Sequence, residues 1–187
     1  MLETKYEEYK DITGLKIGNG IIKNNKNGLS NIDILKIMDQ YKLFLGVFHY
    51  DNIEDVFNYI YKNNIKKGSF IYNYHYHWLA VYFDFEENYE ILHYDPFGYK
   101  YTQKIERLLT KLCTEMNIEY YCKIKYNKVQ NQDINTQNCG WFAIRFLLLI
   151  YNDFNFKDAT EYKHYNIKQN EEDVERIKNN YIEFGFI

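Results

Sequence analysis

The residues whose types most clearly predict chemistry lie where a polar run meets an apolar segment. Residues 131–138 are polar and turn-prone, Cys139-Gly140 follows, and the segment from residue 141 to residue 150 is apolar apart from Arg145. An apolar run of this length predicts a buried helix of about three turns, too short to span a bilayer. A cysteine in the first turn of a helix lies at the positive end of the helix dipole, which stabilises a thiolate. Cys139 is therefore the candidate nucleophile; the alternative is a small apolar residue that opens a core helix.

A cysteine nucleophile requires a base within hydrogen-bond reach, and that base requires an acceptor that orients it. The sequence contains five histidines: His49, His75, His77, His93 and His164. His77 begins a predicted strand, and Asp95 ends the next one after a hairpin, so pairing brings both residues to one edge of the sheet. There, Asp95 could bond one ring nitrogen of His77 and leave the other for Cys139. We therefore favour His77 as the base, with His75 and His93 as alternatives.

Acyl transfer also requires hydrogen-bond donors for the oxyanion. The backbone N–H of Cys139, at the start of a helix, is one candidate donor. A side-chain amide from the preceding loop is another, and the residue types leave three of them open: Gln130, Gln132 and Gln137. The chemistry thus requires a hairpin end and a loop to meet at the head of one helix.

Apolar periodicity predicts the elements that must position these residues. Ser30 and Asp33 have the spacing of a capping box, which predicts a helix start. The apolar face of that helix is Ile32, Leu35, Ile37 and Met38. Further helices are expected at residues 52–63, 101–116 and 170–181, and strands at residues 44–48, 69–74, 77–85, 89–94 and 120–126. Residues 1–28 are expected to form a turn-rich loop. Central strands flanked by helices, without β-α alternation, predict an α+β fold.

Composition limits the classes of protein to be considered. The chain has 187 residues with 46% hydrophobic and 19% aromatic residues, which predicts one folded domain over residues 1–187. The net charge of −3 gives no reason to expect nucleic-acid binding. Three cysteines without a CxxC pair argue against a disulfide framework and a zinc site, and favour a reducing compartment. The charged N-terminus lacks the apolar core of a signal peptide, so we expect a soluble protein that is intracellular at synthesis.

Four short motifs occur together in a recognisable order. His77-Trp78, then Asp95-Pro-Phe-Gly98, then Gln132, then Cys139-Gly140 resemble the adenovirus-type cysteine protease, adenain. Adenain belongs to the clan that also contains the SUMO-deconjugating proteases, within the papain-like superfamily. The resemblance runs from about residue 44 to residue 150. It implies a central mixed β-sheet flanked by helices, with the nucleophile at the N-terminus of a buried helix.

The resemblance also implies a role for each motif residue. Cys139 would be the nucleophile, His77 the general base, Asp95 the group that orients it, and Gln132 the side-chain oxyanion donor. Substrate binding would fall to Trp78, which would wall a narrow groove that admits glycine, and to Gly140. No metal and no cofactor are implied. Adenain has a glutamate where this chain has the aspartate, and the SUMO-protease branch has an aspartate.

The function implied is that of a viral cysteine endopeptidase, of the virophage or Polinton kind, that cleaves capsid precursors at glycine-containing sites during maturation. Such a protein would be a monomer in the virion and the infected cytoplasm, without membrane contact. Cys122 lies near where adenain bonds its activating peptide, which leaves such an activator open, whereas the acidic chain speaks against activation by DNA. The alternatives are a deconjugase of ubiquitin or SUMO, a catalytically silent binding scaffold and, more distantly, an acetyltransferase on the same triad.

Overall fold

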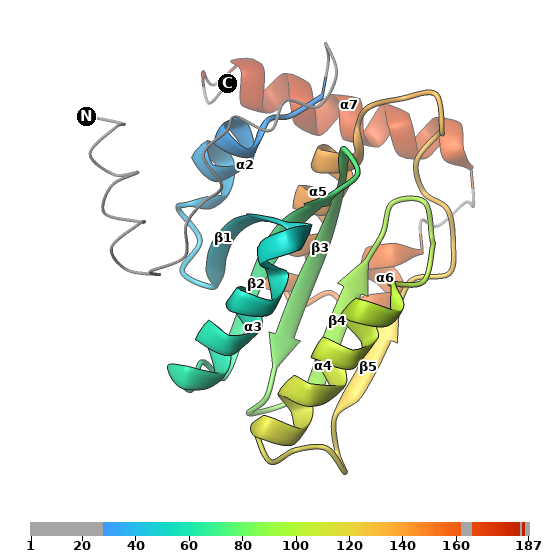
Figure 1. Cartoon of the computed structure of the whole chain (residues 1–187). Coiled ribbons are helices and arrows are strands. Elements are labelled where there is room, and N and C mark those ends of the chain that lie inside the picture. The colour runs from blue at the N-terminus through green and yellow to red at the C-terminus, as the bar shows by residue number, and fades with distance from the viewer. Residues whose placement is uncertain (1–27, 162–165, 184, 186–187) are drawn as a thin grey trace.

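The core of the molecule is a five-stranded mixed sheet, seen in the computed structural model of Figure 1, which describes residues 28–161, 166–183 and 185. The strands are β1 (Phe44–His49), β2 (Lys67–Tyr74), β3 (His77–Asp84), β4 (Glu90–Tyr94) and β5 (Lys123–Tyr126), adjacent in that order. The central pairs β2–β3 and β3–β4 are antiparallel, whereas the outer pairs β1–β2 and β4–β5 are parallel. The mixed sheet predicted from the sequence is confirmed.

Helices cover both faces of this sheet. They are α2 (Asn31–Met38), α3 (Ile53–Lys62), α4 (Gln103–Glu115), α5 (Cys139–Tyr151), α6 (Phe156–Thr160) and α7 (Ile167–Glu183), with a short 3₁₀ helix at Tyr50–Asn52. Side chains of α2, α5, α6 and α7 pack with one face of the sheet, and those of α3 and α4 pack with the other. The α+β class predicted from the sequence is therefore confirmed.

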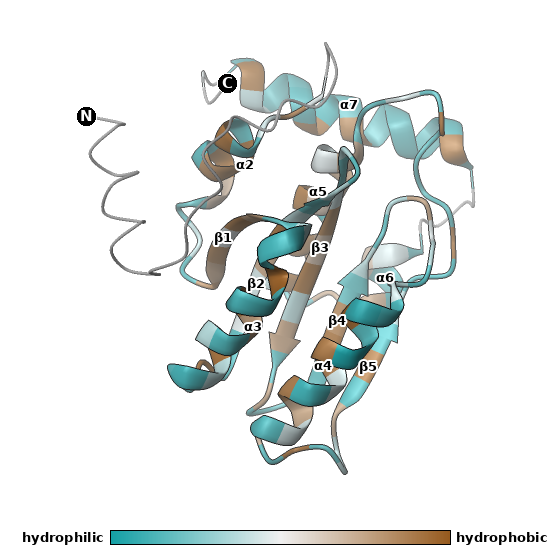
Figure 2. Ribbon diagram, in the orientation of Figure 1, coloured by the Kyte–Doolittle hydropathy of each residue, from teal (hydrophilic) through white to brown (hydrophobic). Residues whose placement is uncertain are grey.

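Strand β3 contributes to both cores because successive side chains of a strand point to opposite faces. Trp78, Ala80 and Tyr82 belong to the α5 side, and Leu79, Val81 and Phe83 belong to the α3–α4 side. This central strand is apolar on both faces and appears brown in Figure 2, whereas α3 and α4 are largely hydrophilic on their outer sides. A strand buried on both faces has a fixed register, because a slip of one residue would exchange its two sets of side chains.

Helix α5 is the apolar segment that the sequence predicted to be a buried helix. Its side chains are buried from Cys139 to Ile144 and again at Phe146, Leu147 and Ile150. Each large apolar side chain buried in this way contributes about 1.5–3 kcal/mol. Packing on all sides therefore fixes the position of the helix whose first residue is Cys139.

The other elements follow the sequence prediction with small differences. The capping box is confirmed, because Ser30 Oγ accepts a hydrogen bond from Asp33 N at 3.2 Å. The buried face of that helix includes Ile34, whereas the predicted Ile32 is only partly buried. Strand β5 begins three residues later than predicted, and the 3₁₀ helix and α6 were not predicted. The glycine-containing loop predicted over residues 1–28 lies outside the described residues except for its last position.

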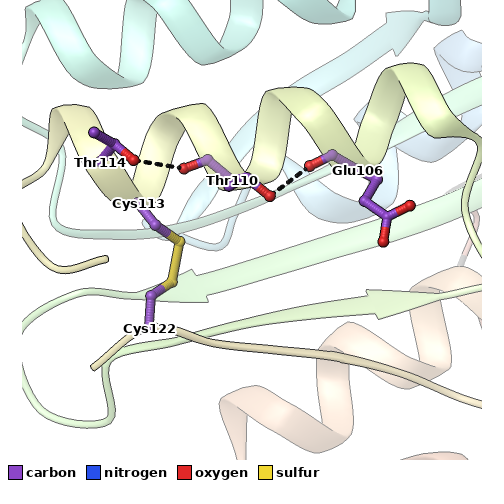
Figure 3. The surroundings of a disulfide bond; sticks show 5 residues. All are labelled: Glu106, Thr110, Cys113, Thr114 and Cys122. Atoms are coloured by element: carbon purple, nitrogen blue, oxygen red, sulfur yellow. Dashed lines mark hydrogen bonds between the residues drawn. A yellow bond between two sulfur atoms is a disulfide. The ribbon is translucent and has the colours of Figure 1, made fainter. Parts of the chain in front are cut away.

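A disulfide joins Cys113, near the end of α4, to Cys122, just before β5 (Figure 3). The cysteine count argued against a disulfide framework, but two of the three cysteines are paired, so the inference of a reducing compartment loses its support. The pair forms because Ile118 N donates to Cys113 O and Cys122 N donates to Ile118 O. These two hydrogen bonds fold the chain back and bring the Cα atoms to 6.1 Å, within the range of disulfides. The hypothesis that Cys122 bonds an activating peptide is also corrected, since its sulfur is bonded to Cys113.

Within the described part of the chain, none of the helices has the length and apolar character needed to cross a membrane.

Candidate active site

A tight hairpin turn places His77 at the beginning of β3. Both residues of the turn, His75 and Tyr76, have positive φ angles of 49° and 64°. Such backbone angles are those of a two-residue turn whose twist matches the paired strands. Tyr76 N also donates to Asn73 Oδ1 at 3.2 Å. The turn thus fixes His77 as the first residue of β3, paired with Tyr74.

The carboxylate of Asp95 lies at the end of the neighbouring strand β4 and holds His77 directly. Its Oδ1 is 2.8 Å from His77 Nε2 and also accepts a hydrogen bond from Phe97 N at 2.8 Å. The ring of Phe97 stacks on that of His77, with centroids 4.4 Å apart and planes 10° apart. The hydrogen bond to Asp95 and the ring contact with Phe97 therefore orient His77, in agreement with the predicted role of Asp95.

The backbone around Asp95 is itself fixed by a single amide. Asn127 Oδ1 accepts from Asp95 N at 2.8 Å, and Asn127 Nδ2 donates to Asp95 O at 2.6 Å. Asn127 immediately follows β5, which pairs in parallel with β4, so both strands deliver their C-terminal ends to the same edge. Asn127 was not among the predicted site residues, although a polar residue directly after a predicted neighbouring strand is a usable signal.

Cys139 is the first residue of α5 and is hydrogen-bonded to the side chain of His77. Burial lowers the pKa of His77, but the hydrogen bonds to Asp95 and Cys139 outweigh burial and raise it to about 9. The ring is therefore an imidazolium at neutral pH. An imidazolium in this position can give its proton to a leaving group. The structure thus brings Cys139, His77 and Asp95 together.

The two alternative bases are occupied elsewhere. His93 is fully buried in β4, where its Nε2 lies 2.8 Å from the hydroxyl of Tyr72. Burial lowers the pKa of His93 to about 4, so it is neutral at physiological pH. His75 is exposed in the hairpin turn, with its ring 4.3 Å from that of Tyr74. Of the three candidates, His77 is the one bonded to Asp95.

Gln132 is the best placed of the three amides considered for the oxyanion. It is 1% exposed, its backbone N donates to Pro96 O at 3.1 Å, and its Nε2 donates to Thr136 O at 3.0 Å. Gln130 uses its amide to donate to Gln132 O, and Gln137 is exposed. Gln132 is therefore fixed in the loop before Cys139, and its part as oxyanion donor stays a prediction.

The side chain of Trp78 lies beneath the site and is covered by Leu29. The indole is fully buried, and its Nε1 donates to Leu29 O at 2.9 Å. A Cβ on Gly140 would lie 3.2 Å from both Trp78 Cδ1 and Leu29 Cδ1, so only glycine fits there without displacing a neighbour. Substrate binding by Trp78 and Gly140 stays a prediction, and Leu29 was not among the predicted site residues.

Among the described residues, no group of three or more histidine, cysteine, aspartate or glutamate side chains is arranged to hold a metal ion.

The fold and the Cys139–His77–Asp95 arrangement define the class of protein as a cysteine peptidase with an α+β fold. Residues 62–183 match the model of the Ulp1 protease family, C-terminal catalytic domain. The match spans more than half of the chain, which therefore belongs to the Ulp1 protease family. This confirms the clan predicted from the motifs. A search of curated protein sequences gave no significant match.

Solved structures show the same fold at low sequence identity. The ASFV pS273R protease is 14% identical with a TM-score of 0.61, over 86% of this chain and 74% of that one. The central domain of the uncharacterized Lpg1148 protein from Legionella pneumophila is 13% identical with a TM-score of 0.61, over 87% of this chain and 100% of that one. At such low sequence identity, the structural similarity shows the fold alone, and the assignment of chemistry depends on the site.

Proposed function

We propose that the protein is a viral cysteine endopeptidase that cleaves virion precursor proteins at glycine-containing sites. The observation that carries the glycine preference is the tight packing around Cys139, which is 4% exposed and followed by Gly140 against Trp78 and Leu29. A substrate residue without a side chain approaches such a nucleophile most easily. The order of motifs shared with the adenovirus-type protease supports the viral part of the proposal, including action in the virion and the infected cytoplasm.

The proposed reaction follows from the geometry of the site. The Cys139 thiolate attacks the substrate carbonyl, and the imidazolium of His77 gives its proton to the leaving amine. A thioester then joins substrate and sulfur. Water, deprotonated by His77, cleaves the thioester and returns the thiolate. Asp95 holds the ring in place throughout, and N–H groups at the head of α5 stabilise the oxyanion.

The test is co-expression of the protein with the capsid proteins of the genome that encodes it, followed by mass spectrometry of the new termini. We expect cleavage next to glycine with the parent protein and none with Cys139→Ala. Cleavage by Cys139→Ala, or no cleavage of any virion protein by the parent, would contradict the proposal.

Deconjugation of a ubiquitin-like protein is the second candidate, favoured by the Ulp1 family match and by the aspartate at position 95. A deconjugase requires a docking surface beside the site. Tyr76, Tyr99 and Ile134 are exposed on the three loops next to His77, Asp95 and Cys139 and could contribute to one. Fluorogenic SUMO and ubiquitin, compared with a short glycine-glycine peptide, separate the two functions. Turnover of the whole protein far above that of the peptide would favour the deconjugase.

A catalytically silent scaffold is the third candidate, and the cysteines themselves provide its test. Cys113 and Cys122 are joined, so Cys139 is the one cysteine outside the disulfide. Rapid native alkylation of Cys139 by iodoacetamide, lost after His77→Ala, is expected of an enzyme. A rate equal to that of the unfolded chain would favour the scaffold.

A further inference from the structure

The loop that precedes Cys139 is held by side chains of the last helix, α7. Glu171 Oε1 accepts hydrogen bonds from Asp133 N at 2.8 Å and from Thr136 Oγ1 at 2.7 Å. Glu171 Oε2 accepts a third from Asn138 Nδ2 at 2.7 Å. One carboxylate on α7 thus bonds the beginning, the middle and the end of residues 133–138. Figure 1 shows this part of the chain, between β5 and α5, passing beside α7.

Neighbouring residues of α7 reinforce the same attachment. Asn170 is 2% exposed, and its Nδ2 donates to Asn131 O at 3.1 Å. Glu175 lies one turn beyond Glu171 on the same helix face, and its Oε1 is 3.2 Å from Asn138 Nδ2. The attachment therefore extends from the residue before Gln132 to the residue before Cys139.

Asn138 shows what this attachment changes at the nucleophile. It is the N-cap of α5, and asparagine at an N-cap usually accepts a hydrogen bond from an N–H of the first turn. Asn138 makes no such side-chain cap hydrogen bond, because its amide is turned toward Glu171 and Glu175. Its side-chain oxygen therefore does not occupy the N–H groups at the positive end of α5, where a developing oxyanion would lie.

Thr136 connects Glu171 to the predicted oxyanion donor. Its hydroxyl donates to Glu171, and its backbone O accepts from Gln132 Nε2 at 3.0 Å. Thr136 Oγ1 is also 3.3 Å from Gln132 Nε2. The orientation of the Gln132 amide thus depends on where Thr136 is held, and Glu171 holds it.

We propose that Glu171 is a positioning residue of the active site, which acts through Thr136 and Asn138 to fix the oxyanion-binding geometry of the loop. Its hydrogen bonds go to Asp133, Thr136 and Asn138 of the loop. The proposal rests on Cys139 being the acyl-accepting nucleophile, and it adds α7, outside all the predicted motifs, to the catalytic apparatus.

The test compares two reactions of Cys139 that differ in one respect. Acylation by a glycyl p-nitrophenyl ester forms an oxyanion, releases p-nitrophenolate and leaves a thioester, whereas alkylation by iodoacetamide forms no oxyanion. For Glu171→Ala we expect the acylation rate to fall about tenfold to a hundredfold, the usual cost of misplacing a catalytic group by about 1 Å. We expect the alkylation rate to stay within about twofold, because the sulfur and His77 are untouched. Glu171→Gln keeps one acceptor oxygen and should recover part of the acylation rate.

Two controls make the outcome decisive. Glu172→Ala removes the next carboxylate of the same helix, which is exposed, and should leave both rates unchanged. In a Glu171→Ala background, Gln132→Ala should cost less than it does alone, because both changes disable the same donor. Equal losses in acylation and alkylation, or additive effects of the two substitutions, would overturn the proposal in favour of a merely structural Glu171. Failure of the parent to be acylated at all would instead refute the nucleophile and with it the proposed function.

Discussion

Two regions of the molecule meet at Cys139, and they are built differently. On one side, the ends of β3 and β4 present His77 and Asp95, with His77 Nε2 2.8 Å from Asp95 Oδ1. The antiparallel ladder brings them to the same edge of the sheet: its last pair is Ala80 with Tyr94, the residue before Asp95, and β3 begins at His77. On the other side lies the loop before α5, which has no strand or helix of its own between Gln132 and Asn138. Side chains from α7 hold it in place.

The difference separates two tasks of the site. The strand side controls proton transfer, because the ion pair between His77 and Asp95 sets the protonation state of His77. The loop side controls geometry: it positions neutral hydrogen-bond donors for the oxyanion, a charge that appears only during the reaction. The strand side is positioned by a backbone ladder, whereas the loop is positioned by a few side-chain hydrogen bonds. Substitutions on the two sides should therefore differ in size and in pH dependence.

The largest effect that distinguishes the two sides is expected for Asp95→Asn. The amide retains the shape of the carboxylate but removes the negative charge that stabilises the imidazolium, and it can select the wrong tautomer of His77. The turnover number on a glycine-containing peptide should fall on the order of a thousandfold to ten-thousandfold, as in other triads. Steady-state kinetics on the purified variant measure this loss.

Asp84 provides the matched control, since it is a second buried carboxylate, at the other end of β3. Its Oδ2 is 3.1 Å from Lys67 Nζ, and Oδ1 accepts from Glu86 N and Glu87 N in the turn. Asp84→Asn should lower the melting temperature but leave the turnover number within severalfold. Similar kinetic losses in the two variants would mean that Asp95 acts only through stability.

The next effect tests the loop side through Gln132→Ala. Loss of one oxyanion donor should lower the turnover number about a hundredfold, with little change in KM, because the donor acts on the transition state. Gln137→Ala, an exposed amide in the same loop, is the control and should be near the parent. Retention of full activity by Gln132→Ala would leave the backbone N–H groups at the head of α5 as the donors.

The same contrast explains how much of the site the sequence predicted. His77, Asp95 and Cys139 were predictable because strand pairing and a helix start constrain them locally, and the motif order then selected His77 over His75 and His93. The α+β class and most helices followed from apolar periodicity. The ends of the elements were predicted less accurately. The strand β5 was predicted to begin too early, because Tyr120 and Tyr121 are residues that favour strands but lie exposed in a turn.

The remaining contacts could not be predicted because they join residues far apart in the sequence through tertiary packing. Glu171 is 38 residues from Asp133, and nothing about a glutamate in an amphipathic helix indicates three acceptor contacts. Leu29 is 49 residues from Trp78, and its backbone oxygen, not its side-chain type, makes the hydrogen bond. The disulfide between Cys113 and Cys122 was missed for a related reason, since an odd number of cysteines does not show which of them are neighbours.

A third prediction concerns the pH dependence that the strand side imposes. Because the pKa of His77 is raised to about 9, the imidazolium is present at neutral pH and is lost as pH rises through about 9. The value of kcat/KM should therefore fall above about pH 9, and the stability contributed by His77, complete below about pH 6.5, should be lost over the same rise. A pH–rate profile and an NMR titration of the His77 ring measure both. In Asp95→Asn the fall of kcat/KM at alkaline pH should occur at lower pH than in the parent, whereas in Gln132→Ala it should occur at the same pH.

The smallest kinetic effect is expected for the histidine that the site does not use. His93 lies on the strand that ends in Asp95, but burial lowers its pKa to about 4, against about 6.5 when unfolded. The unfolded chain therefore binds a proton that the folded chain excludes, and stability falls as pH falls from about 6.5 to about 4. The double substitution Tyr72→Phe/His93→Phe replaces both members of the Tyr72–His93 hydrogen bond. It removes the group that takes up this proton in the unfolded chain and leaves no unpaired hydrogen-bond partner.

The double variant should lose less stability between pH 6.5 and pH 4 than the parent in urea unfolding, while Tyr72→Phe alone should keep the parent's pH dependence. Its turnover number at pH 7 should stay within severalfold of the parent, because neither residue contacts His77 or Cys139 through a hydrogen bond in the described structure. A large kinetic loss at unchanged stability would show that the strand side extends beyond Asp95 into the buried face of β4. The division between a strand region that governs protons and a loop region that governs geometry would then have to include His93.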